Sequence, residues 1–271
     1  MRIVIESVVF YGLCFSLACN ASQPFDIYLK SAKVPVGKVF IYQKSNLDNT
    51  NIGKIAVYYS RIGEIESFKW HEGNSRATVV NAKINSASLN VEYFDAYRLY
   101  SDGKIMPRSK LETISKNEIN IIDGGKERRI KIKNIPWHSY DFDFASLGYS
   151  YRFIKDKKSE NSFNIFDLDS SQKPPVFRDY GVVTMKYHSE EERRSKTLLK
   201  YQINGEGLEN RGGTIWFDKV GQHLVGFEIQ KPDERGYNSG KLVLDRIIEL
   251  DEKGWQLFKI NSIKQTESLH Q

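Results

Sequence analysis

The sequence predicts a mainly β protein, in which a large curved antiparallel meander sheet, or an open or half barrel, carries a short helical corner near residues 140–152. Three observations support this class. Short runs rich in Val, Ile, Tyr and Phe recur at near-regular spacing, with apolar residues on alternate positions, which is the period of a strand with one buried face. Turn-forming Gly, Asn and Asp separate the runs. In the first half, no stretch with a helical period is long enough to predict a helix.

The first half of the chain contains a succession of predicted strands. An opening run at 25–30 and the Pro35-Val36-Gly37 turn precede strands at residues 38–44, 54–60, 64–70, 77–84, 89–100, 118–122 and 127–133. The Asp102-Gly103 pair between two runs is a strong hairpin signal, because both residues tolerate the backbone of a tight turn. We therefore expect a continuous antiparallel meander.

The pattern changes at the corner. Pro136 ends the preceding strand because it cannot donate to a sheet ladder. Apolar residues then follow a spacing of three and four, at Tyr140, Phe144, Leu147 and Tyr151. This spacing predicts about two turns of helix, with Ser139 or Asp141 as the cap that accepts a free backbone amide.

The second half resumes the strand pattern. Predicted strands lie at residues 163–166, 182–188, 198–203, 214–217, 223–229, 242–250 and 255–263, with a charged turn at 190–194 and a frayed tail at 264–271. We expect a single β-rich domain over residues 22–263. Its alternative is two meander halves, 22–135 and 176–263, joined by 136–175.

The N-terminal residues indicate export. A basic start, an apolar run at 8–18 and small residues up to Ala21 are the layout of a secretory signal peptide covering residues 1–21. We therefore expect a periplasmic protein. Ser16-Leu17-Ala18-Cys19 loosely resembles a bacterial lipobox, so a lipoprotein anchored through Cys19 is the alternative; an uncleaved anchor is another. Both cysteines, Cys14 and Cys19, lie in this segment, which excludes a disulfide scaffold after cleavage.

Charge and composition narrow the classes of partner. The net charge is +6, but basic residues are spread along the chain, with short clusters at 126–133, 155–158 and Arg193-Arg194. Nucleic-acid binders concentrate positive charge on one element, so we expect no nucleic-acid partner. Solvated sheet faces explain most of the lysines, and peripheral contact with anionic envelope lipids is the alternative.

Candidate catalytic residues lie before and within the corner. His138, Asp141 and Asp143 pair an imidazole with two carboxylates, which suits general acid and base chemistry. The same groups suit a divalent cation, but no second cluster completes a ligand set, so we predict neither a metal nor a cofactor. The alternative is that the carboxylates cap a helix.

Large aromatic side chains are the candidates for ligand binding. An apolar cleft for a lipid or another amphipathic small molecule would draw on Trp70, Trp137, Tyr140, Phe144, Tyr151 and Trp216. The alternative is that these rings fill the space under a curved sheet.

The order of parts resembles a group of uncharacterised bacterial exported proteins of the domain-of-unknown-function kind. The resemblance rests on the opening at 25–38 with Gly37, on Asp143-Phe144-Ala145-Ser146-Leu147 leading to Arg152, and on Thr214-Ile215-Trp216-Phe217-Asp218. It implies an envelope protein with a curved antiparallel sheet, similar to the half-barrels that carry lipoproteins. It implies no activity.

Three functions remain open at this point. The first is a non-catalytic envelope protein that binds an apolar or amphipathic ligand on the concave face of the sheet. The second is a hydrolase of an envelope polymer that uses His138 with Asp141 or Asp143. The third is a structural or partner-docking protein, recognisable by an exposed sheet edge or a large apolar patch. The oligomeric state does not follow from the sequence.

Overall fold

A computed structural model describes residues 34–85, 88–123, 125–132, 136–139, 144–169, 176–231 and 236–268. In this part of the chain, fifteen strands form one sheet with the order β8-β7-β6-β5-β4-β3-β2-β1-β15-β14-β13-β12-β11-β10-β9. Neighbouring strands are antiparallel, except that β9 and β10 are parallel. The fold is therefore mainly β, as the alternation of apolar residues predicted.

The elements of the first half are β1 Lys38–Ser45, β2 Gly53–Arg61, β3 Glu64–His71, β4 Arg76–Ile84, β5 Val91–Tyr100, β6 Ile105–Ser115, β7 Glu118–Asp123 and β8 Lys126–Lys131. The remainder are β9 Trp137–Ser139, α1 Ala145–Ser150, η1 Tyr151–Phe153, β10 Asn161–Asp169, β11 Val176–Arg193, β12 Lys196–Asn204, η2 Glu206–Leu208, β13 Gly213–Asp218, β14 Leu224–Ile229, β15 Gly240–Glu249 and α2 Glu252–Ser268. The opening strand expected at 25–30 lies outside the described residues.

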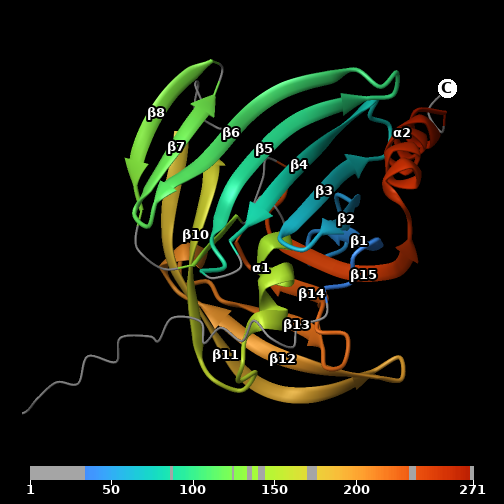
Figure 1. The fold of residues 1–271 in the computed structure, drawn as a ribbon. Helices are drawn as coiled ribbons and strands as arrows, with labels where there is room; N and C mark the ends of the chain where they lie inside the picture. Colours follow the sequence, from blue (N-terminus) through green and yellow to red (C-terminus); the bar gives the residue numbers. More distant parts are fainter. Residues whose placement is uncertain are drawn as a thin grey trace, which may run out of the picture.

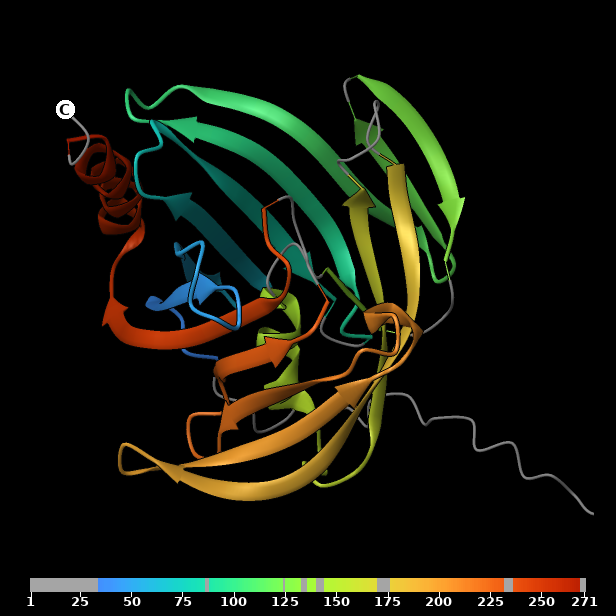
Figure 2. The same ribbon diagram turned by 180° about the vertical axis from the view of Figure 1, so that it is seen from behind.

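The sheet bends around α1 (Figures 1 and 2). Its two meanders meet where the first strand pairs with the last, with Lys38 opposite Glu249 and Ser45 opposite Lys241. The outer strands of this order are β8 and β9, and the sheet does not close between them. One hydrophobic core fills the concave side and takes side chains from both meanders and from α1.

The corner forms the short helix that the spacing of its aromatic residues predicted. All six residues of α1 are buried. The expected cap was wrong for Ser139, which lies in β9, and Asp141 lies outside the described residues. Phe144 occupies the N-cap position with a left-handed backbone, φ 52°, and no side-chain cap bond. This conformation places its ring 5.5 Å from that of Phe227, so core packing takes the place of a polar cap.

The predicted strand at 255–263 was wrong, because these residues belong to α2, which continues to Ser268. Trp255, Lys259 and Ile263 are buried at helical spacing, and α2 packs on the outer face of the first meander through an aromatic cluster. Lys259 lies on the buried side of the helix, whereas Leu257 is 54% exposed. These two exceptions weaken the apolar stripe that predicts a helix.

A buried polar cluster attaches α2 to β3. The Nζ atom of Lys259 forms an ion pair with Glu66, and the Trp255 indole Nε1 donates a hydrogen bond of 2.6 Å to the same carboxylate. The side chain of Lys259 is 1% exposed and that of Glu66 is 13% exposed. The helix is therefore held by one charged pair at the centre of its apolar contact.

The charged turn expected at 190–194 is shorter than predicted. Strand β11 continues to Arg193, and the turn consists of Arg194 and Ser195 before β12 begins at Lys196. The acidic residues at 190–192 pair with Thr197, Leu198 and Leu199 across the hairpin. Charged side chains are tolerated in this strand because they point to solvent or to cations.

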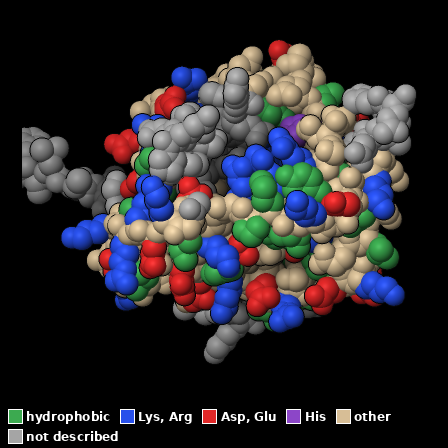
Figure 3. All heavy atoms as spheres, turned by 90° about the horizontal axis from the view of Figure 1, so that it is seen from above, with side chains coloured by type: hydrophobic (Ala, Val, Ile, Leu, Met, Phe, Trp, Pro, Cys, Tyr) green, Lys and Arg blue, Asp and Glu red, His purple; other side chains and the backbone are tan. Residues whose placement is uncertain are grey.

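The remaining surface carries mixed charge. On the face seen in Figure 3, basic and acidic side chains are interspersed, and small groups of hydrophobic side chains lie between them. None of the helices among the described residues combines the length and the apolar character needed to cross a lipid bilayer.

Candidate functional site

Three of the aromatic residues that the sequence analysis put forward as ligand-binding residues lie in the core of the concave side. Trp137, Phe144 and Tyr151 are almost completely buried. The Tyr151 ring stacks on Phe217 with centroids 3.6 Å apart. A void beside α1, next to Gly148, measures about 10 Å³, which is the size of one water molecule. In this region the aromatic rings fill the space under the sheet.

The next two aromatic candidates are Trp70 and Tyr140. Trp70 lies on the outer face of β3, where its ring stacks on Phe68 at 4.6 Å and meets Phe258 of α2 edge-on at 6.0 Å. It therefore serves the contact between the helix and the sheet. Tyr140 lies outside the described residues.

His138 is enclosed in the core. Its Nδ1 lies 3.0 Å from Ser146 Oγ, and its ring meets that of Phe163 at 5.4 Å. Burial lowers the pKa of His138 to about 3, so the imidazole is neutral at pH 7. Asp141 and Asp143 lie outside the described residues. Among the described residues, no group of three or more His, Cys, Asp or Glu side chains is placed to hold a metal ion.

The buried imidazole makes stability depend on pH. Between pH 6.5 and about pH 3, the unfolded chain binds a proton at His138 and the folded chain does not, so the free energy of unfolding falls as the pH is lowered. His223 adds to the same trend, because burial lowers its pKa to about 4. We expect His138→Asn to flatten the profile by up to about 1.4 kcal/mol per pH unit in this window.

Urea unfolding at a series of pH values from 7 to 4 measures this effect. His188→Asn is the control, because His188 is exposed at the surface. An unchanged slope in His138→Asn would show that the imidazole is protonated in the folded protein, and would contradict its enclosure.

Arg152, at the end of the corner, contacts the first meander from the inside. Its guanidinium lies 5.2 Å from the centre of the Tyr59 ring in β2. Burial raises the pKa of the Tyr59 phenol, so this ring remains neutral. The Tyr149 hydroxyl accepts a hydrogen bond of 2.7 Å from the backbone amide of Gly63. These contacts give the interior polar groups a structural role.

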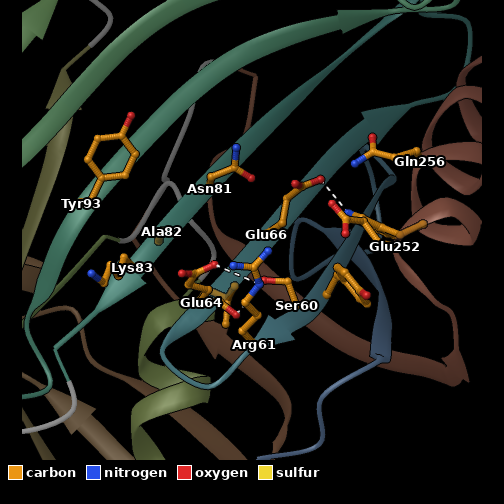
Figure 4. Close-up of a pocket in the computed structure, with 13 residues that line it drawn as sticks. Ser60, Arg61, Glu64, Glu66, Asn81, Ala82, Lys83, Tyr93, Glu252 and Gln256 are labelled. Atoms are coloured by element: carbon orange, nitrogen blue, oxygen red, sulfur yellow. Dashed lines mark hydrogen bonds and ion pairs between the residues drawn. The ribbon is translucent and has the colours of Figure 1, made fainter.

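A hollow of about 450 Å³ lies on the outer face between strands β2 to β5 and the first turn of α2 (Figure 4). Its charges are largely satisfied internally. Arg61 Nε lies 3.9 Å from Glu64 Oε2, Lys83 Nζ lies 3.6 Å from Glu92 Oε2, and Glu66 belongs to the cluster that holds α2. Such a surface offers little net charge to a ligand.

A second hollow, here named the outer groove, crosses the outer face of the second meander and has a volume of about 430 Å³. It is lined by Arg193, Arg194, Lys196, Leu198, Trp216, Val225, Gly226, Glu228, Leu242, Val243, Leu244, Asp245, Arg246 and Ile247. Its volume lies within the usual range of small-molecule sites. Of the five aromatic candidates that the structure describes, Trp216 is the one that lines it.

Strand pairing builds the floor of the outer groove. Trp216 faces outward because its neighbours Ile215 and Phe217 point into the core. Across the sheet, Trp216 lies opposite Gly226, and Gly226 lies opposite Val243. A Cβ atom at Gly226 would lie 2.2 Å from the Leu242 carbonyl oxygen, so only glycine fits there. Trp216, Gly226 and Val243 therefore form a row across three strands, with no side chain at its middle position.

The edge of the groove is basic. The Arg193 guanidinium lies 4.4 Å from the centre of the Trp216 ring. The Glu191 carboxylate holds this arrangement. It accepts a hydrogen bond of 3.1 Å from Trp216 Nε1, and it forms ion pairs with Arg193 at 3.0 Å and with Lys200 at 2.7 Å. The hydrogen bond from Lys200 lowers the pKa of Glu191, which keeps the carboxylate charged.

The side chains that line the groove are mainly aliphatic or charged. Among the described residues that line it, six are aliphatic, four are cationic and two are acidic, and none is Ser, Thr, Asn, Gln, Tyr or His. Three of the aliphatic residues, Leu242, Leu244 and Ile247, pack toward the core. In the sequence, Arg193 and Arg194 form a short basic cluster, and Trp216 is one of the aromatic candidates. The register that brings them together could not be predicted from the local pattern, because it depends on how far β11 and β12 extend.

The chain therefore has a mainly β fold with one open, curved sheet and a groove on its outer face. No family model and no curated protein matches the sequence. Among solved structures, it is similar to a β-barrel-like protein of domain of unknown function DUF1849 from Brucella abortus, with 9% sequence identity and a TM-score of 0.46. The match covers 80% of this chain and 98% of that chain.

Proposed function

We propose that this protein is a non-catalytic binding protein for an amphipathic anion, which it holds in the outer groove. The observation that carries the proposal is the composition of the groove, in which an apolar floor of Leu198, Trp216, Val225 and Val243 adjoins a basic edge, with no neutral hydrogen-bonding side chain among the described lining residues. An aliphatic body buried on such a floor contributes roughly 25 cal/mol per Å² of apolar surface removed from water. The cations select an acidic end group.

The same composition disfavours other ligand classes. Sugars and nucleobases present several hydroxyl or amide groups, and a site for them supplies matching polar side chains. The lining offers aliphatic and charged groups instead. The concave face, where we first expected the ligand, contains Trp137, Phe144 and Tyr151 as core residues. The hydrolase alternative loses support because His138 is enclosed and neutral.

We also propose that the protein is exported to the periplasm. The layout of residues 1–21 supports export. The alternative is an exported lipoprotein that is anchored to the membrane through Cys19. In either case the protein would meet amphipathic molecules released from the envelope.

The groove is tested by placing a charge on its floor. Val243 is 41% exposed and lies beside Gly226 in the row that crosses the groove floor. Val243→Asp removes apolar contact and repels an anion, so we expect the affinity for oleate to fall at least about tenfold. Titration of oleate against bound anilinonaphthalene sulfonate measures the change, with circular dichroism to confirm folding.

Val220→Asp is the matched control. Val220 is 90% exposed in the turn between β13 and β14 and does not line the groove, so its replacement should leave oleate binding unchanged. Equal affinity in wild type and Val243→Asp, or no saturable binding of oleate to the wild type, would reject the outer groove as the binding site.

A further inference from the structure

We infer that the hairpin tip, residues 193–196, is the recognition element for the acidic end of the ligand, and that Arg194 binds a single carboxylate. This inference rests on the proposed function and specifies its ligand as a long-chain carboxylate. Three observations carry it: the backbone of the turn, the pairing of charges around the groove, and the position of Arg194 relative to the apolar floor.

The backbone at the tip is unfavourable for the residues that occupy it. Arg193 and Lys196 face each other across the hairpin, and the two residues between them, Arg194 and Ser195, have φ values of 49° and 60°. Positive φ at both central positions is typical of a type I′ turn, where Asn-Gly is favoured. A left-handed backbone costs roughly 1–2 kcal/mol for an ordinary L-residue. Such strain points to a role for the side chain.

The other charges of the groove are paired. Arg193 pairs with Glu191 at 3.0 Å and Lys196 with Asp218 at 3.8 Å. Pairs also join Arg246 to Asp245 and Lys241 to Glu228. Arg194 forms no ion pair within the described part of the chain. One cation of the lining is therefore left to bind a ligand.

The remaining charge selects the head group. A single guanidinium matches a carboxylate, which carries one negative charge and accepts two parallel hydrogen bonds from it. A phosphomonoester carries between one and two charges near pH 7, and the paired cations would have to leave their own carboxylates to neutralise it. The groove thus favours a carboxylate over a phosphate.

The position of Arg194 separates the two ends of the ligand. Arg194 lines the groove from the tip of the hairpin. The row of Trp216, Gly226 and Val243 crosses the sheet away from this tip. A fatty acid with its carboxylate at the tip places its hydrocarbon chain over the apolar floor of Leu198, Trp216, Val225 and Val243. The outer groove therefore fits one acyl chain with one carboxylate.

The test replaces the strained pair by the residues that the turn prefers. Arg194→Asn with Ser195→Gly should raise the melting temperature, because Asn and Gly adopt positive φ at lower cost. The affinity for oleate should fall at least about tenfold, which is the loss of one charge-assisted bidentate contact. The affinity for oleyl alcohol, which has the same chain without the charge, should be unchanged.

One control and three possible outcomes distinguish the explanations. Arg211→Asn is the control, since Arg211 is an exposed arginine paired with Glu209 outside the groove, and it should leave oleate affinity unchanged. Wild-type protein that binds neither oleate nor oleyl alcohol would refute the proposed function itself. Unchanged oleate affinity in the double variant would overturn the role of Arg194 and leave the groove standing. Stronger binding of oleyl phosphate than of oleate by the wild type would overturn the carboxylate assignment.

Discussion

Lys259→Met is expected to lower the free energy of unfolding by about 3 kcal/mol, because it leaves the Glu66 carboxylate beneath α2 without its cation. The pair is enclosed, with Lys259 1% exposed and Glu66 13% exposed. The loss should fall at the low end of the range for broken buried pairs, since Glu66 reaches some solvent and still accepts from Trp255. Urea unfolding followed by tryptophan fluorescence measures it.

A second substitution separates charge from packing. Glu66→Gln combined with Lys259→Met removes both charges and keeps an oxygen for the Trp255 indole, so stability should return to within about 1 kcal/mol of the wild type. The matched control is Lys38→Met, which breaks an exposed pair with Glu249 at 3.5 Å and should cost about 0.5 kcal/mol. Equal losses in Lys259→Met and Lys38→Met would contradict the structural role of the buried pair.

Leu147→Ala is expected to destabilise the protein by about 3 kcal/mol, the usual cost of a cavity at a fully buried leucine. Leu147 is completely buried in α1, which lies inside the bend of the sheet (Figure 1). Its environment consists of side chains from both meanders, so the surrounding backbone has little freedom to collapse into the space. Denaturant titration provides the measurement.

Leu257→Ala is the corresponding control. It is the same substitution in a helix, at a leucine that is 54% exposed on α2, and it should change stability by about 0.5 kcal/mol or less. If Leu147→Ala and Leu257→Ala both lowered the free energy of unfolding by the same small amount, α1 would not be a packed part of the interior.

Most strands could be predicted because their two faces differ. In β12, Leu199, Tyr201 and Ile203 are buried and alternate with the half-buried or exposed polar residues that follow them, and this contrast repeats in several other strands. The helix α2 could not be predicted, since Lys259 interrupts its buried side and Leu257 its exposed side. Its packing depends on Glu66, which lies in a distant part of the chain. Long-range partners of this kind leave no local pattern.

The candidate site was predictable in its parts and not in its arrangement. Trp216 and the Arg193-Arg194 cluster were both visible in the sequence. The row that joins Trp216, Gly226 and Val243 depends on the register of three strands, and an irregularity between Trp216 and Phe217 shifts that register. Conversely, aromatic residues such as Trp137 and Tyr151 appeared suitable for a ligand because composition does not distinguish a lined cavity from a filled core.

The pairing of β1 with β15 has a consequence for the order of folding. Most neighbouring strands are joined by short connections, so each meander can form from local contacts. Lys38 and Glu249, by contrast, are 249 − 38 = 211 positions apart and still face each other. Contacts of such long range slow folding, because the entropy of closing the loop is lost before they form. On the ribosome, both meanders could be largely built while β1 remained an open edge, and that edge would be covered only after β15 had been synthesised.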